Sequence, residues 1–250
     1  MIGNRDEYES MYQAERKLWW YRVLHNKVIR QIQTVFPTDQ SIRILDAGCG
    51  TGGLLDALRQ AGYLNTLGFD ASTDAVFFSR ERNLPVELHN LLDINSFHPS
   101  ESFDVIICDD VLYFFNDEQI RHILGVFRQR LRPGGIFISN NNAFPALRGT
   151  HDIALNISRR FVKKELADFA GQTGFSLKQV FYWNFLLTIP IWVVRKIQLL
   201  VWRLNPARPV HSDVNQPPHW LNTLLLNILR LEERLFRKPL FGSSLFTVMR

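Results

Sequence analysis

A glycine-rich run, Asp46–Gly52, carries the residue types and spacing best suited to holding a ligand. It follows a short β-rich stretch, Ile42–Ala47, and precedes a helical apolar pattern over Leu54–Ala61. Glycine lets the backbone approach a bound molecule closely, and the first turn of a helix offers N–H groups that have no partner within the helix. Ligands of open α/β sheets bind at such strand-to-helix turns. The run therefore predicts a binding loop, and the alternative is a tight turn that binds nothing.

The residues around this loop distinguish between kinds of ligand. A phosphate-binding loop ends in Gly-Lys-Ser or Gly-Lys-Thr, whereas two leucines follow the glycines here. Gly48, Gly50 and Gly53 meet the spacing of a dinucleotide fingerprint, so an NAD(P)-dependent oxidoreductase is a competing hypothesis. Asp46, however, lies inside the turn, where its carboxylate would repel a pyrophosphate. It suits a ligand with a cationic or hydroxyl-rich end.

Five motifs occur in an order that resembles class I S-adenosylmethionine-dependent methyltransferases. Asp46–Gly52 resembles the first motif, and Gly68–Asp70 resembles the acidic end of the second strand, whose carboxylate accepts hydrogen bonds from the cofactor's ribose hydroxyls. Leu92–Ile94 resembles the segment that borders adenine. Phe103–Leu112 is similar to the fourth strand and the loop behind it, and Leu131–Gly135 to the turn before the fifth strand.

This resemblance spans about residues 42–142 and implies S-adenosylmethionine as cofactor, with S-adenosylhomocysteine as product. It assigns the ribose to Asp70 and the exocyclic amine of adenine to Asp93. Trp20 would cover the methionine end, or else it staples the opening helix to the sheet. The residues implied for the cofactor are Asp46, Ala47, Gly48, Cys49, Gly50, Gly52, Asp70, Ala71, Leu92, Asp93, Asp109 and Trp20.

The elements that position these residues alternate between strand and helix patterns. The predicted strands are Ile42–Ala47, Leu64–Phe69, Val86–His89, Phe103–Cys108, Ile136–Ser139, Ser176–Tyr182 and Leu245–Met249. The predicted helices are Glu7–Thr34, Leu54–Ala61, Ser72–Asn83, Glu118–Leu131 and Lys163–Thr173. The alternation predicts an α/β, doubly wound, mostly parallel sheet. The resemblance implies seven strands in a Rossmann-like methyltransferase fold, with the last strand antiparallel between the fifth and sixth.

The expected organisation has three parts. Residues 1–40 form an N-terminal helical lid, residues 41–183 with 241–250 form the core, and residues 184–240 form a basic, aromatic-rich helical insertion before the last strand.

The acceptor side departs from the branch of the family that methylates small molecules and lipids. Tyr113 and Phe114 stand where that branch often carries Glu-His, which predicts an apolar acceptor pocket. His151 resembles a histidine that follows the fifth strand there, and it is the candidate general base. Its alternative is a hydrogen-bonded loop histidine. We expect methyl transfer to a small or lipid-like acceptor, on oxygen; a cofactor-binding module without turnover is the alternative.

Composition and charge limit the class of protein further. The 250 residues are 46% hydrophobic and 21% charged, the mix of a globular domain. Residues 1–150 hold 15 Lys and Arg against 18 Asp and Glu, whereas residues 151–250 hold 14 against 6, which indicates an anionic partner for the second part. Two cysteines, Cys49 and Cys108, exclude a disulfide scaffold and a Cys-rich zinc site, and no metal is expected. The polar start lacks a signal region, so we expect a cytoplasmic protein.

The insertion combines apolar, aromatic and basic side chains. Phe181–Val194 is nearly uncharged but is too short, and too interrupted by Pro190, to span a bilayer. Arg195–Arg203 sets cations beside aliphatic residues, and Trp220–Arg237 is an amphipathic helix. A hinge is expected at the prolines between them, Pro206, Pro209, Pro217 and Pro218. This composition favours an interfacial helix over a nucleic-acid binder. Peripheral membrane or lipid contact, a substrate lid and a homodimer surface stay open, and so does the oligomeric state.

Overall fold

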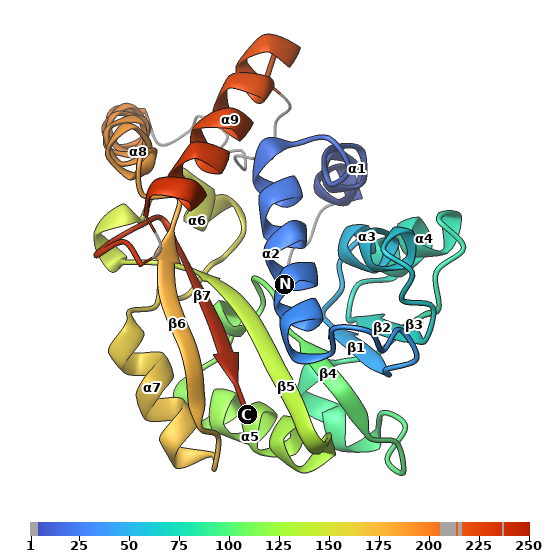
Figure 1. Cartoon of the computed structure of the whole chain (residues 1–250). Helices are drawn as coiled ribbons and strands as arrows, with labels where there is room; N and C mark the ends of the chain where they lie inside the picture. The colour runs from blue at the N-terminus through green and yellow to red at the C-terminus, as the bar shows by residue number, and fades with distance from the viewer. Residues whose placement is uncertain (1–4, 206–213, 215–216, 237) are drawn as a thin grey trace.

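The computed structural model describes residues 5–205, 214, 217–236 and 238–250. Its centre is a seven-stranded sheet in the order β3-β2-β1-β4-β5-β7-β6, with helices on both faces (Figure 1). The strands are β1 (Ile44–Ala47), β2 (Thr66–Asp70), β3 (Val86–Leu88), β4 (Phe103–Ile107), β5 (Leu131–Asn142), β6 (Leu177–Trp183) and β7 (Ser244–Met249).

Helices alternate with strands along the central part of the chain, and two helices precede the first strand. The α-helices are α1 (Arg5–Ala14), α2 (Trp19–Val35), α3 (Gly53–Gln60), α4 (Thr73–Glu81), α5 (Asp117–Arg130), α6 (Thr150–Ala154), α7 (Lys163–Gln172), α8 (Thr188–Leu204) and α9 (His219–Leu235). Short 3-10 turns lie at η1 (Leu91–Ser96), η2 (Leu112–Phe114) and η3 (Pro145–Leu147).

The strand directions confirm the expected fold class. The strands β1 to β5 pair in parallel, whereas β7 is antiparallel to both β5 and β6. Two layers of helices enclose the sheet because β4 is apolar on both faces, with Val105, Ile106 and Ile107 fully buried. The helices α5 and α7 pack on one face, and α2, α3 and α9 pack on the other.

Two local predictions differ from the structure. The predicted turn before the fifth strand lies within β5, where the pairing shifts register between Phe103 and Val105 and Gly134 adopts a φ of +87°. The predicted opening helix Glu7–Thr34 is two helices, because Leu18 is extended (φ −65°, ψ 131°). The break turns α1 onto α4, where the rings of Tyr12 and Phe78 stack 5.2 Å apart.

The insertion contains two long helices, α8 and α9, at the same end of the molecule as α1 (Figure 1); α9 lies beside α2, and α8 lies near α6. Pro190 is in the first turn of α8, where a missing N–H costs no helical hydrogen bond. None of the helices in the described part of the chain is long and apolar enough to cross a membrane. Of the predicted hinge, Pro206 and Pro209 lie outside the described residues, as does Arg237 at the end of the predicted second helix.

Candidate functional site

A cavity of about 720 Å³ lies where the carboxyl ends of β1, β2 and β4 meet. Its floor includes the glycine loop, Asp70 and the Asp109–Asp110 pair. Residues of α1 and α2 cover it, and residues of α8 form part of its wall. The volume is in the range of small-molecule sites, and its position is the one expected for an open α/β sheet.

The glycine loop is fixed to the end of β2 by backbone hydrogen bonds. The N–H groups of Gly48 and Cys49 both donate to the carbonyl of Phe69, each at 2.9 Å. Gly48 has a φ of +82°, and a Cβ there would lie 2.6 Å from Cγ2 of Val111. Glycine is therefore required both by the backbone angle and by the space.

Asp70 is held in one orientation by the backbone around it. Its Oδ2 accepts a hydrogen bond from the N–H of Gly50 at 3.0 Å, and its Oδ1 accepts one from the N–H of Ser72 at 2.9 Å. Burial raises the pKa of Asp70, while the backbone donors oppose that shift. Each carboxylate oxygen keeps a further lone pair, so the group can also accept from ligand hydroxyls.

Several buried carboxyl groups line the cavity, and burial favours their neutral forms. Burial, with repulsion from Glu15 and Asp70, raises the pKa of Asp46 to about 8. Burial raises the pKa of Asp110 to about 7 and that of Asp109 well above its usual range. The Oδ2 atom of Asp109 is buried and has no hydrogen-bond partner among the described residues.

These carboxyl groups fit an organic cation. Over the ranges that the structure describes, no three His, Cys, Asp or Glu residues are arranged to hold a metal ion. The carboxyl groups are instead spread along the cavity floor. S-adenosylmethionine carries two separated positive groups, a sulfonium and an ammonium, and a ribose with two hydroxyls. The residues present therefore suit this cofactor in charge and in hydrogen-bonding capacity.

The N-terminal helices close over the glycine loop through a buried ionic contact. Oε2 of Glu15 accepts a hydrogen bond from Oγ1 of Thr51 at 2.5 Å and lies 3.0 Å from Nη1 of Arg82. Arg82 also donates to the carbonyl of Tyr12 at 2.7 Å. Burial raises the pKa of Glu15 to about 7 against the opposing effect of Arg82. This contact joins the end of α1 to the loop.

Trp20 lines the cavity and also joins α2 to the sheet, while its contact with the methionine end of the cofactor stays a prediction. Its side chain lines the cavity, and its ring stacks on that of Trp183, with centroids 5.7 Å apart. Trp183 is buried and donates from Nε1 to Oδ1 of Asn140 at 2.8 Å. Trp20 thus forms cavity wall and joins α2 to the sheet.

The far end of the cavity is aromatic and apolar. Tyr113 and Phe114 line it together with half-buried His151. The residue after this histidine, Asp152, accepts hydrogen bonds from Nε and Nη2 of Arg160 at 2.7 and 2.9 Å. This buried pair fixes α6, the short helix that carries His151.

Most of the predicted site residues line the cavity. Those that do are Asp46, Gly48, Cys49, Gly50, Asp70, Ala71, Leu92, Asp109, Trp20 and His151. Three predicted residues do not. Ala47 is enclosed at the end of β1, and Gly52 packs against Leu84 and Ser79 at the start of α3. Asp93 is exposed on η1, so the structure does not bring its carboxylate to the cavity.

The sequence analysis missed residues that the tertiary structure brings to the cavity. Tyr8, Glu15, Tyr21 and Asp110 all line it. Asp110 is adjacent to a predicted residue, and its φ of +58° marks an unusual backbone. Tyr21 directly follows the predicted Trp20, whereas Tyr8 and Glu15 belong to a segment that no motif singles out. Cys49 is buried in the loop, and burial raises the pKa of its thiol well above the usual range, which disfavours a role as nucleophile.

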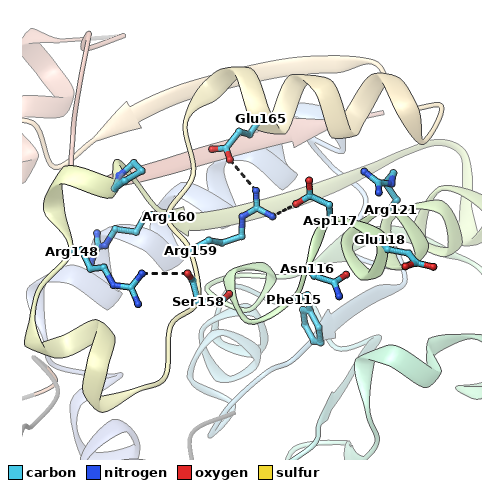
Figure 2. Close-up of a pocket in the computed structure, with 11 residues that line it drawn as sticks. Phe115, Asn116, Asp117, Glu118, Arg121, Arg148, Ser158, Arg159, Arg160 and Glu165 are labelled. Atoms are coloured by element: carbon cyan, nitrogen blue, oxygen red, sulfur yellow. Dashed lines mark hydrogen bonds and ion pairs between the residues drawn. The ribbon is translucent and has the colours of Figure 1, made fainter.

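A second hollow, on the outer surface, is lined by charged side chains. Figure 2 shows Arg159 between Asp117 and Glu165, with ion pairs to both carboxylates, and Arg148 donating to the carbonyl of Ser158. The glycine loop and the buried carboxyl groups at the strand ends line the other cavity. We therefore assign the functional site to the cavity above the glycine loop.

Comparisons with known proteins agree with the geometry. Residues 44–135 match the family described as "Methyltransferase domain". The chain is 26% identical over 97 residues to a 23S rRNA (cytidine-2'-O)-methyltransferase, TlyA, of Campylobacter jejuni, a match of 36% of this chain and 38% of that protein. It is 25% identical over 210 residues to a ubiquinone biosynthesis O-methyltransferase of Pseudomonas fluorescens, covering 72% of this chain and 87% of that one.

A solved structure shares the fold. A SAM-dependent methyltransferase from Archaeoglobus fulgidus superposes with a TM-score of 0.54 at 14% identity, covering 90% of this chain and 93% of that chain. At this identity the likeness extends to the fold alone. The match to the rRNA enzyme spans 38% of that protein's length.

Proposed function

Since this chain carries a class I S-adenosylmethionine-dependent methyltransferase domain, we propose that it transfers the cofactor's methyl group to an oxygen of a small, apolar acceptor. The observation that carries the proposal is the division of one cavity into two chemically different ends. Carboxyl groups and the glycine loop form one end, and aromatic and aliphatic side chains form the other.

The acidic end supplies the cofactor contacts in this proposal. The Asp70 carboxylate accepts from the ribose hydroxyls, and Asp46 and Asp109 face the cationic portion. Leu92 lies against the adenine. When bound, S-adenosylmethionine supplies an electrophilic methyl group on a positively charged sulfur. The protein then needs mainly to align the acceptor and exclude water, which Trp20 and α2 do by covering the loop.

The apolar end receives the acceptor. Phe114, Leu187 and Ile191 offer no hydrogen bonds from their side chains, which favours an aromatic or lipid-like molecule. His151, at this end, takes the proton of the acceptor hydroxyl on an imidazole nitrogen. The O-methyltransferase of ubiquinone biosynthesis among the relatives supports a small acceptor that is methylated on oxygen.

A second candidate is a module that binds the cofactor without turnover. It is favoured by Tyr113 and Phe114, which stand where related enzymes often carry Glu-His. Its cavity would bind S-adenosylmethionine as tightly but would transfer no methyl group.

Thermal shift and methyl transfer together test these functions. We expect S-adenosylmethionine and S-adenosylhomocysteine, but not NADH, to raise the melting temperature by several degrees through native-state binding. Mass spectrometry would then follow methylation of hydroxyaromatic probes with and without apolar chains. Methylation of the chain-bearing probes supports the proposal. Binding without turnover over the whole probe set favours the second candidate, and a shift with NADH alone contradicts both.

A further inference from the structure

Helix α8 presents a continuous apolar face away from the body of the molecule. The side chains of this face, which we call the α8 face, are 42–79% exposed: Ile189, Val193, Val194, Ile197, Leu200 and Leu204. At 100° per residue they cover an arc of roughly 140°, and Trp192 lies about 60° beyond its edge, on the far side of Lys196 and Arg203. Such a face on one helix is much larger than the scattered exposed residues of ordinary surfaces.

The buried side of α8 fixes this orientation. Arg195 is buried and donates from Nη1 to the carbonyl of Leu147 at 2.9 Å. Thr188 is buried and donates from Oγ1 to the carbonyl of Asn184 at 2.6 Å. These contacts direct the opposite side of the helix, the α8 face, to solvent.

Helix α9 also has an exposed apolar face, which covers a narrower arc than the α8 face. Trp220, Leu224, Leu231 and Leu235 are 48–68% exposed and lie within about 60° of one another around the helix. Their opposite side packs into the core through Leu226 and Leu229. Both helices of the insertion therefore have exposed apolar surfaces at the same end of the molecule (Figure 1).

Charge indicates what covers the α8 face. Lys196, Arg203 and the indole of Trp192 lie along one edge, and α8 contains no acidic residue. On α9, Glu232 is buried and accepts from the N–H of Leu186, while Glu233 pairs with Lys27 and Arg30. A two-fold contact between copies would therefore bring cations together with no carboxylate on α8 to oppose them. An anionic lipid surface supplies the missing negative charge.

The α8 face is also connected with the cavity. Val194 is 52% exposed and at the same time lines the cavity, as does exposed Pro190. The cavity thus reaches the surface beside the apolar face. A molecule that leaves a lipid layer next to α8 can enter the apolar end without crossing water.

We propose that α8 and α9 dock the protein on an anionic lipid surface, with Trp192 and the aliphatic side chains of the α8 face in the interface, and that the acceptor enters the cavity from that surface. The entry of the acceptor from the lipid surface rests on the proposed function, because it concerns the methyl acceptor. The docking itself does not, because it concerns only the exposed faces of α8 and α9. The docking is peripheral, since neither helix crosses the membrane.

Vesicle co-sedimentation of the full chain, without cofactor or acceptor, tests the docking. We expect binding to vesicles of phosphatidylcholine with phosphatidylglycerol, weaker binding to phosphatidylcholine alone, and loss of the difference at high salt. The double variant I197E/L200E should lower the partition coefficient by roughly tenfold or more for each residue. K196Q/R203Q should lower it by about fivefold for each charge, on the anionic vesicles only.

A matched control is L64E/L88E, because Leu64 and Leu88 are 75% and 53% exposed but lie away from α8. It should bind vesicles as the parent chain does, and all variants should keep the thermal shift with S-adenosylmethionine. That shift reports on the cofactor site alone, so failed docking and failed cofactor binding are distinguishable. No binding of the parent chain to either vesicle overturns the proposal. The proposal is also overturned if light scattering shows a dimer that the substitutions I197E/L200E dissociate, and the parent chain binds no vesicles.

Discussion

Asp70 is oriented before any ligand binds, because two backbone N–H groups hold its two oxygens. Asp93, by contrast, directs no group into the cavity. It lies exposed on η1, and the interactions around it use its backbone carbonyl, which accepts from Oγ of Ser96 at 2.8 Å. The two aspartates that the family resemblance pairs as cofactor ligands are therefore not equivalent in this chain.

The substitution Asp70→Asn should weaken S-adenosylmethionine binding by about 100-fold, since a charged acceptor of two hydroxyl hydrogen bonds becomes a neutral one. The fold should persist, because the amide oxygen still accepts from a backbone N–H. Asp93→Asn is the matched control and should change affinity by less than about twofold. Isothermal titration calorimetry measures both. An equal loss in the two variants would contradict this geometry and return the adenine contact to Asp93.

At the scale of elements, the junction between α1 and α2 determines whether the cavity is covered. The chain leaves helical geometry at Leu18, and the preceding turn places Glu15 between Thr51 of the glycine loop and Arg82 after α4. One side chain thus joins three segments that are far apart in sequence. Its removal would leave the Arg82 guanidinium buried without its carboxylate.

Glu15→Ala should lower the free energy of unfolding by about 3 kcal/mol, the usual cost of breaking one side of a buried ion pair. It should also weaken cofactor binding, because α1 would no longer be held against the loop. Glu9→Ala, an exposed change on the same helix, is the control and should have little effect on either quantity. Urea unfolding followed by circular dichroism measures the stability. If Glu15→Ala unfolds like Glu9→Ala, the contact does not hold α1 in place.

At the scale of the whole molecule, buried carboxyl groups and a buried histidine give stability opposite dependences on pH. Burial raises the pKa of Asp46 from about 4 to about 8, so the stability that the neutral carboxyl contributes is lost as pH rises through that window. Burial lowers the pKa of His25 to about 4, so stability is lost as pH falls from about 6.5 towards 4, where the unfolded chain binds a proton that the buried ring does not. Above that pH the carboxyl groups dominate.

The melting temperature without ligand should therefore fall by several degrees between about pH 6.5 and pH 8.5. S-adenosylmethionine should raise it more at the higher pH, because its positive groups stabilise the ionised carboxyls and binding releases protons. Differential scanning fluorimetry at the two pH values, in buffers of equal ionic strength, measures both trends. A ligand-induced shift that is independent of pH would show that the carboxyl cluster does not face the cation. Asp46→Asn should reduce the pH dependence, and the part that remains is expected from Asp109 and Asp110, whose pKa values burial also raises.

The sequence alone predicted the α/β sheet and the glycine loop between β1 and α3, and that the loop binds a ligand stays a prediction. The sheet and the loop follow from features that are local in the chain: alternation of strand and helix patterns, and glycines at a strand-to-helix turn. The role of the aspartate that ends β2 came from the family resemblance. The antiparallel last strand came from the family resemblance, and the structure confirms it. The sequence also shows the apolar and basic composition of the insertion, but it does not predict which side of the two helices is exposed.

The tertiary structure determined which further residues reach the cavity and what their pKa values are, because both depend on contacts between segments that are distant in the sequence. Glu15 belongs to the cavity only because the chain breaks at Leu18 and meets Arg82. Asp93 lies outside it because η1 turns the side chain to solvent. The raised pKa of Asp46 is a consequence of burial and of neighbouring carboxyls, which no linear pattern encodes. Burial is a property of the packed molecule, so the electrostatics of the site and the exposed face of α8 emerge only from the fold.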